Sequence, residues 1–270
     1  MVNKYFWFFL LISSLYTSVL GQNQKEVYPS GYFWNKNEAA QFFGDSPYGI
    51  GTDVIHRRGS VLNNGNPFER HLRTSIRPWF HMQFGPDARL SLSPLGYFAT
   101  NEYVALPTDF DRPSSFELRS TIQFFHHHKQ LMGKIMHTWR YRLEFRNRLT
   151  DGADEFTNFS RFRFRYRFRY IINAPDFYTQ GMWYTNASLE LGLNMGNPVV
   201  FNTFNQSRVY VGVGRRIFNS ARVELRYVDR FRSRGTGFEM DRGKGVMLAI
   251  NIDQASILGR KYTQPVRYAD

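Results

Sequence analysis

The sequence predicts an all-β fold, an antiparallel transmembrane β-barrel of about ten strands, within a range of roughly eight to twelve. Apolar and polar residues alternate over long segments, which is the period of a strand and not of a helix. An apolar N-terminal segment has the pattern of an export signal. The mean hydropathy of −0.46 excludes a bundle of membrane helices. It does not exclude a barrel, because half of a barrel's strand residues face a polar interior.

Composition excludes several other classes of protein. The chain has 270 residues, with 35 Lys and Arg against 22 Asp and Glu, and therefore a net charge of +13. Cysteine is absent, which excludes a disulfide scaffold, a thiolate zinc site and a cysteine nucleophile. The 26 Phe and 16 Tyr residues are too many for a disordered basic tail.

Residues 1–21 are predicted to be a secretory signal peptide. Lys4 precedes an apolar core, and Val19 and Gly21 suit the −3 and −1 positions of a cleavage site before Gln22. An N-terminal membrane anchor is the alternative, but the core contains Ser and Thr and is shorter than the roughly 20 residues of a membrane helix. We therefore expect an exported chain whose destination is the outer membrane of a Gram-negative cell envelope.

The mature chain divides into three predicted parts. Residues 22–48 lack clean alternation and are expected to form an N-terminal periplasmic segment or plug, residues 49–252 the barrel, and residues 253–270 a polar C-terminal tail. Turn sequences such as Asn64-Gly65 and Asp151-Gly152 separate the strands. Strands are expected near residues 49–57, 70–83, 89–102, 116–128, 139–148, 161–172, 183–193, 208–216, 221–231 and 245–252.

The strand expected at 161–172 defines the two faces of the barrel wall. Its aromatic residues, from Phe162 to Tyr170, share one parity, and its arginines, from Arg161 to Arg169, share the other. A strand places these sets on opposite faces, and its length suits a tilted strand that crosses a bilayer. We expect the aromatic face to meet lipid and the charged face to line a hydrated lumen. The basic residues predicted to line the lumen are Arg140, Arg142, Arg146, Arg161, Arg163, Arg165, Arg167, Arg169, Arg208, Arg222 and Arg226, with Glu144, Glu190 and Glu224 as acidic partners.

Several segments resemble a known family. Residues 139–146 (Trp-Arg-Tyr-Arg-Leu-Glu-Phe-Arg) and 161–166 resemble its arginine-rich hairpin, residues 204–214 resemble its strand of Asn and Arg followed by small residues, and residues 223–227 resemble the next strand. The family is the bacterial one catalogued as domain of unknown function 2490, and the resemblance covers about residues 49–252. It implies an outer-membrane-type β-barrel of unassigned function, and it supplies no catalytic residues.

Candidate catalytic and metal-binding residues are few. His126 and His128 share a face of one expected strand, which is compatible with two metal ligands, but a hydrophilic strand end or loop is the favoured explanation. Two Ser–His pairs, His137 with Ser120 and His81 with Ser91, lie on neighbouring expected strands, and their geometry decides whether they can react. We predict no catalytic residue, no metal and no cofactor.

The predicted function is that of a monomeric outer-membrane barrel with an Arg-rich lumen, structural or transport-associated, with a narrow anion-favouring pore as one form of the transport role. The expected partners are outer-membrane lipid and a small anionic solute. Nucleic acid is not expected, because an RNA-binding sheet needs its aromatic and basic residues on one face. Two alternatives stay open, namely a barrel enzyme that modifies envelope lipid and a secreted β-sandwich or lipocalin-like binding protein.

Overall fold

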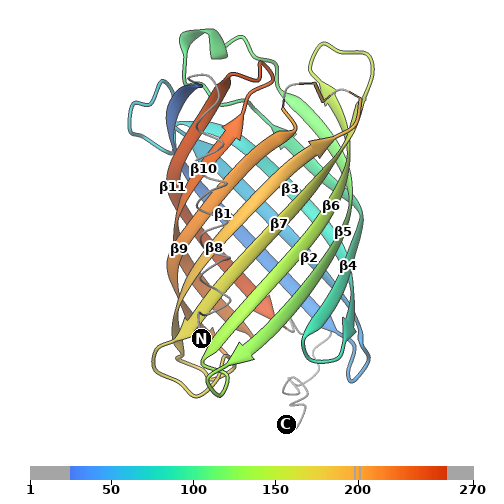
Figure 1. Cartoon of the computed structure of the whole chain (residues 1–270), viewed down its shortest axis with the longest axis vertical. Helices are drawn as coiled ribbons and strands as arrows, with labels where there is room; N and C mark the ends of the chain where they lie inside the picture. Colours follow the sequence, from blue (N-terminus) through green and yellow to red (C-terminus); the bar gives the residue numbers. More distant parts are fainter. Residues whose placement is uncertain (1–24, 198, 201, 254–270) are drawn as a thin grey trace, which may run out of the picture.

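The computed structural model describes residues 25–197, 199–200 and 202–253. In this part of the chain, eleven strands form a closed barrel with a short 3-10 helix, η1 (Pro107–Asp109), in one loop (Figure 1). The predicted β-barrel is confirmed. The strands are β1 (Glu26–Phe42), β2 (Tyr48–Gly59), β3 (Arg70–Phe84), β4 (Ala88–Thr100), β5 (Ser115–Gln130), β6 (Ile135–Thr150), β7 (Thr157–Ile171), β8 (Trp183–Met195), β9 (Phe204–Phe218), β10 (Ala221–Ser233) and β11 (Glu239–Asp253).

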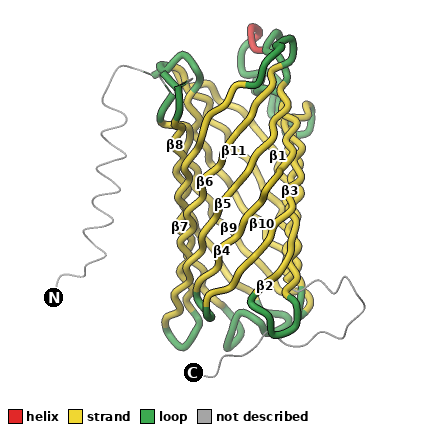
Figure 2. Tube along the Cα trace, turned by 90° about the vertical axis from the view of Figure 1, so that its right-hand side faces the viewer, coloured by secondary structure: helices red, strands yellow, loops and turns green. Residues whose placement is uncertain are grey.

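Each strand pairs with its neighbours in the chain in the antiparallel sense, and the barrel closes by a parallel pairing of β1 with β11. The closure is parallel because the number of strands is odd. The described chain therefore begins at one end of the barrel and ends at the other (Figure 2). We call the end that carries the loop with η1 the upper end, as it is drawn in Figure 1, and the opposite end the lower end.

The prediction for residues 22–48 was wrong where they are described. Glu26–Phe42 is not a segment outside the barrel but its first strand. The expected alternation is lost there, because the buried inner side carries Tyr32 and Trp34 beside Lys36, while Asn35 and Asn37 occupy the outer side. A search for apolar residues outside and polar residues inside therefore does not recognise β1. The other ten strands lie where the sequence predicted them, and the predicted signal peptide and all but the first residue of the predicted tail lie outside the described residues.

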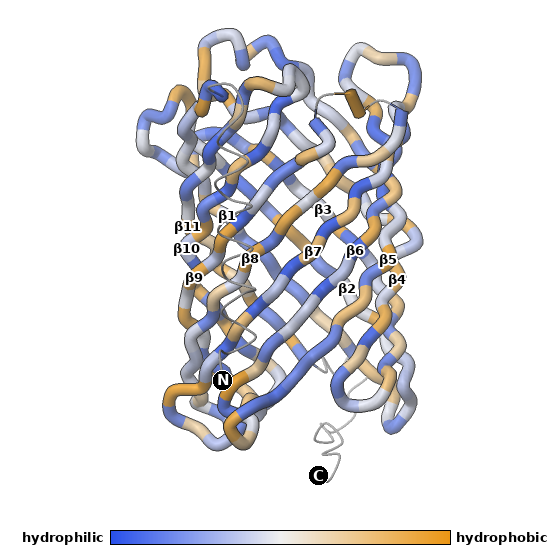
Figure 3. The backbone as a smooth tube through the Cα atoms, in the orientation of Figure 1, coloured by the Kyte–Doolittle hydropathy of each residue, from blue (hydrophilic) through white to orange (hydrophobic). Residues whose placement is uncertain are grey.

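The two faces of the wall differ sharply in chemistry. Along β7 the arginines face the interior, and all but Arg167 are buried, while the aromatic side chains between them form the outer side. Rings of adjacent strands pack against each other there, as in the pair Tyr141 and Phe164, whose centroids are 5.4 Å apart. The alternation of hydrophobic and hydrophilic residues runs along most strands in Figure 3. Exposed apolar residues of the outer wall include Ile76, Phe80, Leu92, Ile122, Phe145, Val211, Leu225 and Val246.

Glycine is required where the wall must approach other groups closely. A Cβ on Gly245 of β11 would lie 1.9 Å from the carbonyl oxygen of Tyr32 on β1. A Cβ on Gly214 of β9 would lie 2.3 Å from the ring of Tyr184 on β8, which covers that glycine from inside. Closure of the barrel at β1 and β11 therefore depends on the missing side chain at Gly245.

The upper end of the interior is partly filled by a loop that we call the mouth loop, residues 101–114. Its Tyr103 and Val104 are almost fully buried, and Tyr103 belongs to the same buried cluster as Tyr32 and Val228 of the barrel wall. Leu62 of the loop between β2 and β3 donates its backbone N–H to the carbonyl of Val104. No helix of the described chain has the length and apolarity that crossing a membrane requires.

Candidate functional site

The interior arginines are the most unusual chemical feature of the structure. All eleven arginines singled out from the sequence lie on the inner face of the wall; nine are buried, and Arg167 and Arg222 are half-buried. The three glutamates singled out with them, Glu144, Glu190 and Glu224, have no more than 1% of their surface exposed. A buried charge is costly unless it is paired and hydrogen-bonded, so the partners of these groups decide what the interior can do.

Glu190 of β8 is the centre of one cluster. Its carboxylate accepts hydrogen bonds from Arg140, Arg163, Arg165 and Arg208, which come from β6, β7 and β9. The Nε of Arg165 is 2.8 Å and the Nη1 of Arg208 is 3.0 Å from the nearer carboxylate oxygen. One negative charge therefore holds four guanidinium groups of three strands.

Glu144 of β6 is the centre of a second cluster. Its oxygens lie within 4 Å of guanidinium nitrogens of five arginines, and the closest is Nη1 of Arg163 at 3.0 Å. Arg163 binds Glu144 and Glu190 together, so it links the two clusters. The other four guanidinium groups lie 3.5 to 3.9 Å away and belong to Arg77, Arg119, Arg142 and Arg161.

The sequence interpretation missed further carboxylates inside the barrel. Asp53 of β2 binds Arg77, whose Nε is 3.0 Å away, and Glu117 of β5 binds both Arg119 and Arg146. On β5, polar residues alternate with apolar ones at Ser115, Glu117 and Arg119. This is the same pattern as on β7, over a shorter segment. Ion pairing inside the barrel is thus more extensive than the three predicted glutamates imply.

Glu224 has a different environment from the other two glutamates. It is in contact with the guanidinium of Arg226, two residues further along β10. The hydroxyl of Tyr184 donates a hydrogen bond of 2.7 Å to its other oxygen. A phenol of β8 and a guanidinium of β10 therefore share this carboxylate.

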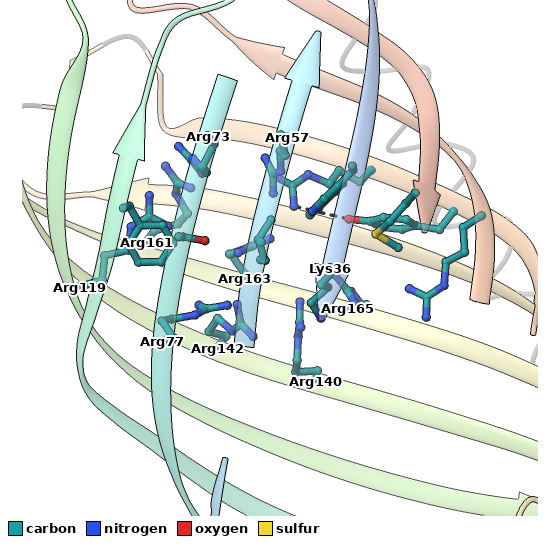
Figure 4. A pocket seen from close by; sticks show the side chains of 18 residues that line it. Lys36, Arg57, Arg73, Arg77, Arg119, Arg140, Arg142, Arg161, Arg163 and Arg165 are labelled. Atoms are coloured by element: carbon teal, nitrogen blue, oxygen red, sulfur yellow. Dashed lines mark hydrogen bonds between the residues drawn. The ribbon is translucent and has the colours of Figure 1, made fainter. Parts of the chain in front are cut away.

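Despite these pairs, one interior cavity has a purely cationic charged lining. It measures about 30 Å³, and the charged side chains that line it are Lys36 and eleven arginines. Figure 4 draws the side chains around this cavity and labels ten of the cations, which come from β1, β2, β3, β5, β6 and β7. Aromatic rings support two of them, since the guanidinium carbon of Arg57 lies 3.6 Å from the ring centroid of Trp34 and that of Arg119 lies 3.7 Å from that of Phe98. No carboxylate is among the described residues that line the cavity, so the charged groups that face its contents are positive.

The mouth loop is held by two acidic residues of its own. Glu102 accepts hydrogen bonds from Arg148 of β6 at 3.1 Å and from Arg232 of β10 at 2.9 Å. Burial alone would raise the pKa of the Glu102 carboxyl, but the charges of Arg232 and Arg148 outweigh burial and lower that pKa from 4.5 to about 2. Glu102 is therefore ionised at neutral pH and ties the loop to two strands.

Asp109 of η1 forms the second tie. Its oxygens accept two hydrogen bonds from Arg234, of 3.1 and 3.0 Å, and one each from the backbone N–H groups of Ala105 and Leu106. Burial works against ionisation, but the backbone N–H groups and Arg234 outweigh it and lower the pKa of Asp109 below its usual 3.8. Arg234 also binds Asp241 of β11, so this tie reaches the last strand.

The structure separates the two Ser–His pairs considered from the sequence. Nδ1 of His81 lies 2.8 Å from the hydroxyl oxygen of Ser91. Ser120 instead donates to the carbonyl oxygen of Pro94, while His137 bonds Tyr166. Ser91 is 1% exposed, so a substrate has no access to its hydroxyl in this arrangement, and the His81–Ser91 pair is a buried polar contact.

The three adjacent histidines do not converge. His126 stacks on Trp139, with ring centroids 5.7 Å apart, whereas His127 points inward and bonds the hydroxyl of Thr138 at 3.0 Å. Among the residues that the structure describes, no three His, Asp or Glu side chains are grouped as a metal ion would require.

Comparisons with known proteins identify the family of the chain but assign no function to it. Searches of curated proteins and of solved structures found no match. The family model described as protein of unknown function (DUF2490) matches residues 32–241. This match spans most of the chain and includes all the strands that bear the arginine clusters. The chain therefore belongs to the DUF2490 family.

Proposed function

We propose that the protein is an outer-membrane β-barrel whose cationic interior attracts small anions and offers them a narrow path. The observation that carries this proposal is the combination of an outer wall rich in exposed apolar side chains with an interior cavity lined by twelve cations. Contiguous apolar surfaces on soluble monomers rarely exceed a few hundred Å². Exposed apolar residues here extend over most of the strands around the barrel.

The dimensions of the wall also support a membrane location. The strands contain 12 to 17 residues, whereas a tilted strand needs about 9 to 11 to cross a bilayer. Closure leaves no open sheet edge, which is a requirement for any strand in hydrocarbon. The predicted signal peptide provides the route of export.

The narrowness of the path follows from the packing inside. A second interior cavity adjoins the first, and both are lined by Lys36, Arg140, Arg142 and Arg165. A row of fixed cations in a confined space repels cations and concentrates anions. The mouth loop, tied by Glu102 and Asp109, narrows the upper end further. We therefore expect a small conductance with anion selectivity, unlike that of a general porin.

Planar-bilayer recording tests this proposal directly. The refolded barrel is inserted into a bilayer between two KCl solutions of different concentration, and the reversal potential gives the selectivity. The expected result is a small conductance whose reversal potential has the sign of anion selectivity. The same recording with Arg57→Gln should show weaker selectivity, whereas Arg215→Gln, which removes a charge at Trp183 on the outer side, should not. Cation selectivity, or no conductance, would remove the path and leave a structural barrel.

The two alternative functions have less support. A barrel enzyme acting on envelope lipid needs its reactive groups within reach of lipid, and His81 and Ser91 lie inside the wall. A soluble binding protein needs a polar outer surface, and the outer side of β7, β8 and β9 is mainly apolar.

A further inference from the structure

A second cavity occupies the lower half of the interior. It measures about 140 Å³ and is lined by residues from the ends of strands that meet at the lower turns, among them Glu38, Arg89, His127, Arg169 and Asp253. We call it the lower chamber. A single water needs roughly 10–15 Å³ of such volume, so the lower chamber has room for a small polyatomic ion and several waters.

Three arginines of the lower chamber have no carboxylate oxygen within 4 Å, the distance of a direct ion pair, in the described part of the chain. Within the described part of the chain, Arg89, Arg167 and Arg169 each line the chamber and form no ion pair. Arg169 donates only to the sulfur of Met136 at 2.9 Å and to the hydroxyl of Thr138 at 3.4 Å, and its Nε is buried without a partner. Arg89 lies over the ring of Phe125, 4.7 Å from its centroid, and its Nε is likewise buried without a partner.

The carboxylates of the chamber are already engaged. Glu38 is in contact with Lys36, and Asp253 binds both Arg222 and Arg216. Asp53 binds Arg77, with two hydrogen bonds between the side chains. Eight cations line the chamber against these three carboxylates, the cations being Lys36, Arg89, Arg140, Arg142, Arg165, Arg167, Arg169 and Arg222. Arg140 and Arg165 are already paired with Glu190, and Arg142 lies 3.5 Å from Glu144. The positive charge that no described carboxylate contacts is therefore that of Arg89, Arg167 and Arg169.

This arrangement differs from that of the guanidinium groups around Glu190. There, each buried guanidinium contacts a carboxylate, and this pairing offsets part of the cost of burying the charge. Arg89, Arg167 and Arg169 carry the same charge in a confined space with no such partner. Groups of this kind are stabilised by a bound anion, and the planar fork of a guanidinium matches oxyanions with two parallel hydrogen bonds.

We propose that the lower chamber is a binding site for a tetrahedral oxyanion of the phosphate class, free or as a small monoester. Arg89, Arg167 and Arg169 supply the charge from β4 and β7, and the hydroxyl of Thr138 and the ring of His127 lie on the same wall. A dianion offers enough oxygens for three guanidinium forks, which a chloride ion does not. The site rests on the proposed function only in that anions must reach the interior.

Isothermal titration of the refolded barrel in detergent with inorganic phosphate tests the site without any conductance. In a low-chloride buffer we expect saturable binding of one phosphate per barrel. Arg167→Gln should weaken it at least tenfold, and because Arg167 has no described ion pair, its loss leaves no carboxylate unpaired. Arg215→Gln, on the outer side, should leave the affinity unchanged, and heat-modifiable gel mobility verifies that both variants are folded. A parallel titration with glycerol phosphate distinguishes a monoester ligand from free phosphate.

The outcomes separate this site from the proposed pore. The absence of saturable binding of both phosphate compounds would overturn the site, even if the bilayer recordings show anion selectivity. Binding that Arg167→Gln and Arg169→Gln leave unchanged would also overturn it, since the phosphate would then be held elsewhere. Saturable binding that both variants weaken, in a barrel that shows no conductance, would support the site and contradict the pore.

Discussion

Replacing Glu102 by glutamine tests the tie that holds the mouth loop on the barrel. The substitution removes a charge that accepts hydrogen bonds from Arg148 and Arg232 but preserves the shape of the side chain. The pKa of Glu102 is lowered from 4.5 to about 2. At about 1.4 kcal/mol for each tenfold change in proton affinity, this amounts to about 3 kcal/mol in favour of the closed loop at neutral pH.

The sign of the pH dependence follows from the direction of that pKa change. A carboxyl whose pKa is lower in the closed state stabilises that state fully above pH 4.5, and the contribution is lost as the pH falls through about 2. Wild-type and Glu102→Gln proteins should therefore differ by a factor of roughly 300 in loop opening at pH 7, and by only about tenfold at pH 3.

Hydrogen–deuterium exchange of the barrel in detergent measures this opening. The peptides to follow cover the mouth loop and residues 60–69, because Leu62 donates its N–H to Val104 at 2.8 Å. Glu155→Gln, in the exposed loop between β6 and β7, is the matched control and should exchange like the wild type. A change of less than threefold at pH 7, or a change that is equal at pH 7 and pH 3, would show that the Glu102 carboxylate does not hold the loop closed.

Three further predictions concern the wall and its ion pairs. Glu190→Gln leaves four guanidinium groups without their shared carboxylate and should lower the free energy of unfolding in urea by about 3–5 kcal/mol. A loss below about 1 kcal/mol would contradict a stabilising role of the ion pairs around Glu190. Gly245→Ala places a methyl group 1.9 Å from the carbonyl oxygen of Tyr32 and should abolish heat-modifiable mobility, whereas Gly235→Ala, with no atom within 4 Å of the new carbon, should not. Tyr184→Phe removes the 2.7 Å hydrogen bond to Glu224 and should cost about 1–3 kcal/mol by urea unfolding; equal stability would show that water replaces the phenol.

The sequence predicted the strands in which polar residues face the interior and apolar residues face outward. It failed to predict the strand in which this pattern is absent. In β7 each arginine faces inward and each aromatic residue outward, so the pattern itself reveals the strand. In β1 the inner residues include Tyr32 and Trp34, which pack in the interior hydrophobic cluster, as well as Lys36. Asn35 and Asn37 bond to each other on the outer side. The pattern of β1 thus depends on contacts with distant residues such as Arg57 and Tyr210.

The arginines of the candidate site were predictable, and their partners only in part. Arg163 and Glu190 are 27 residues apart in the chain but are in contact because β7 and β8 are neighbours in the wall. Glu117, Asp53 and the ties of the mouth loop depend on which strands are adjacent and on how a loop folds back. The excess charge of the lower chamber likewise appears only when pairs such as Lys36 with Glu38 and Arg222 with Asp253 are known.

Fluorescence quenching by brominated lipids tests most directly whether the apolar side of the wall meets hydrocarbon. Two single-tryptophan variants reconstituted in vesicles would be compared, one that retains Trp139 on the outer side of β6 and one that retains Trp34 on the inner side of β1. If the outer side of the wall meets hydrocarbon, bromine on the acyl chains quenches Trp139 strongly and Trp34 only weakly. Quenching of neither residue, or of Trp34 more than Trp139, would contradict a membrane barrel with a cationic interior.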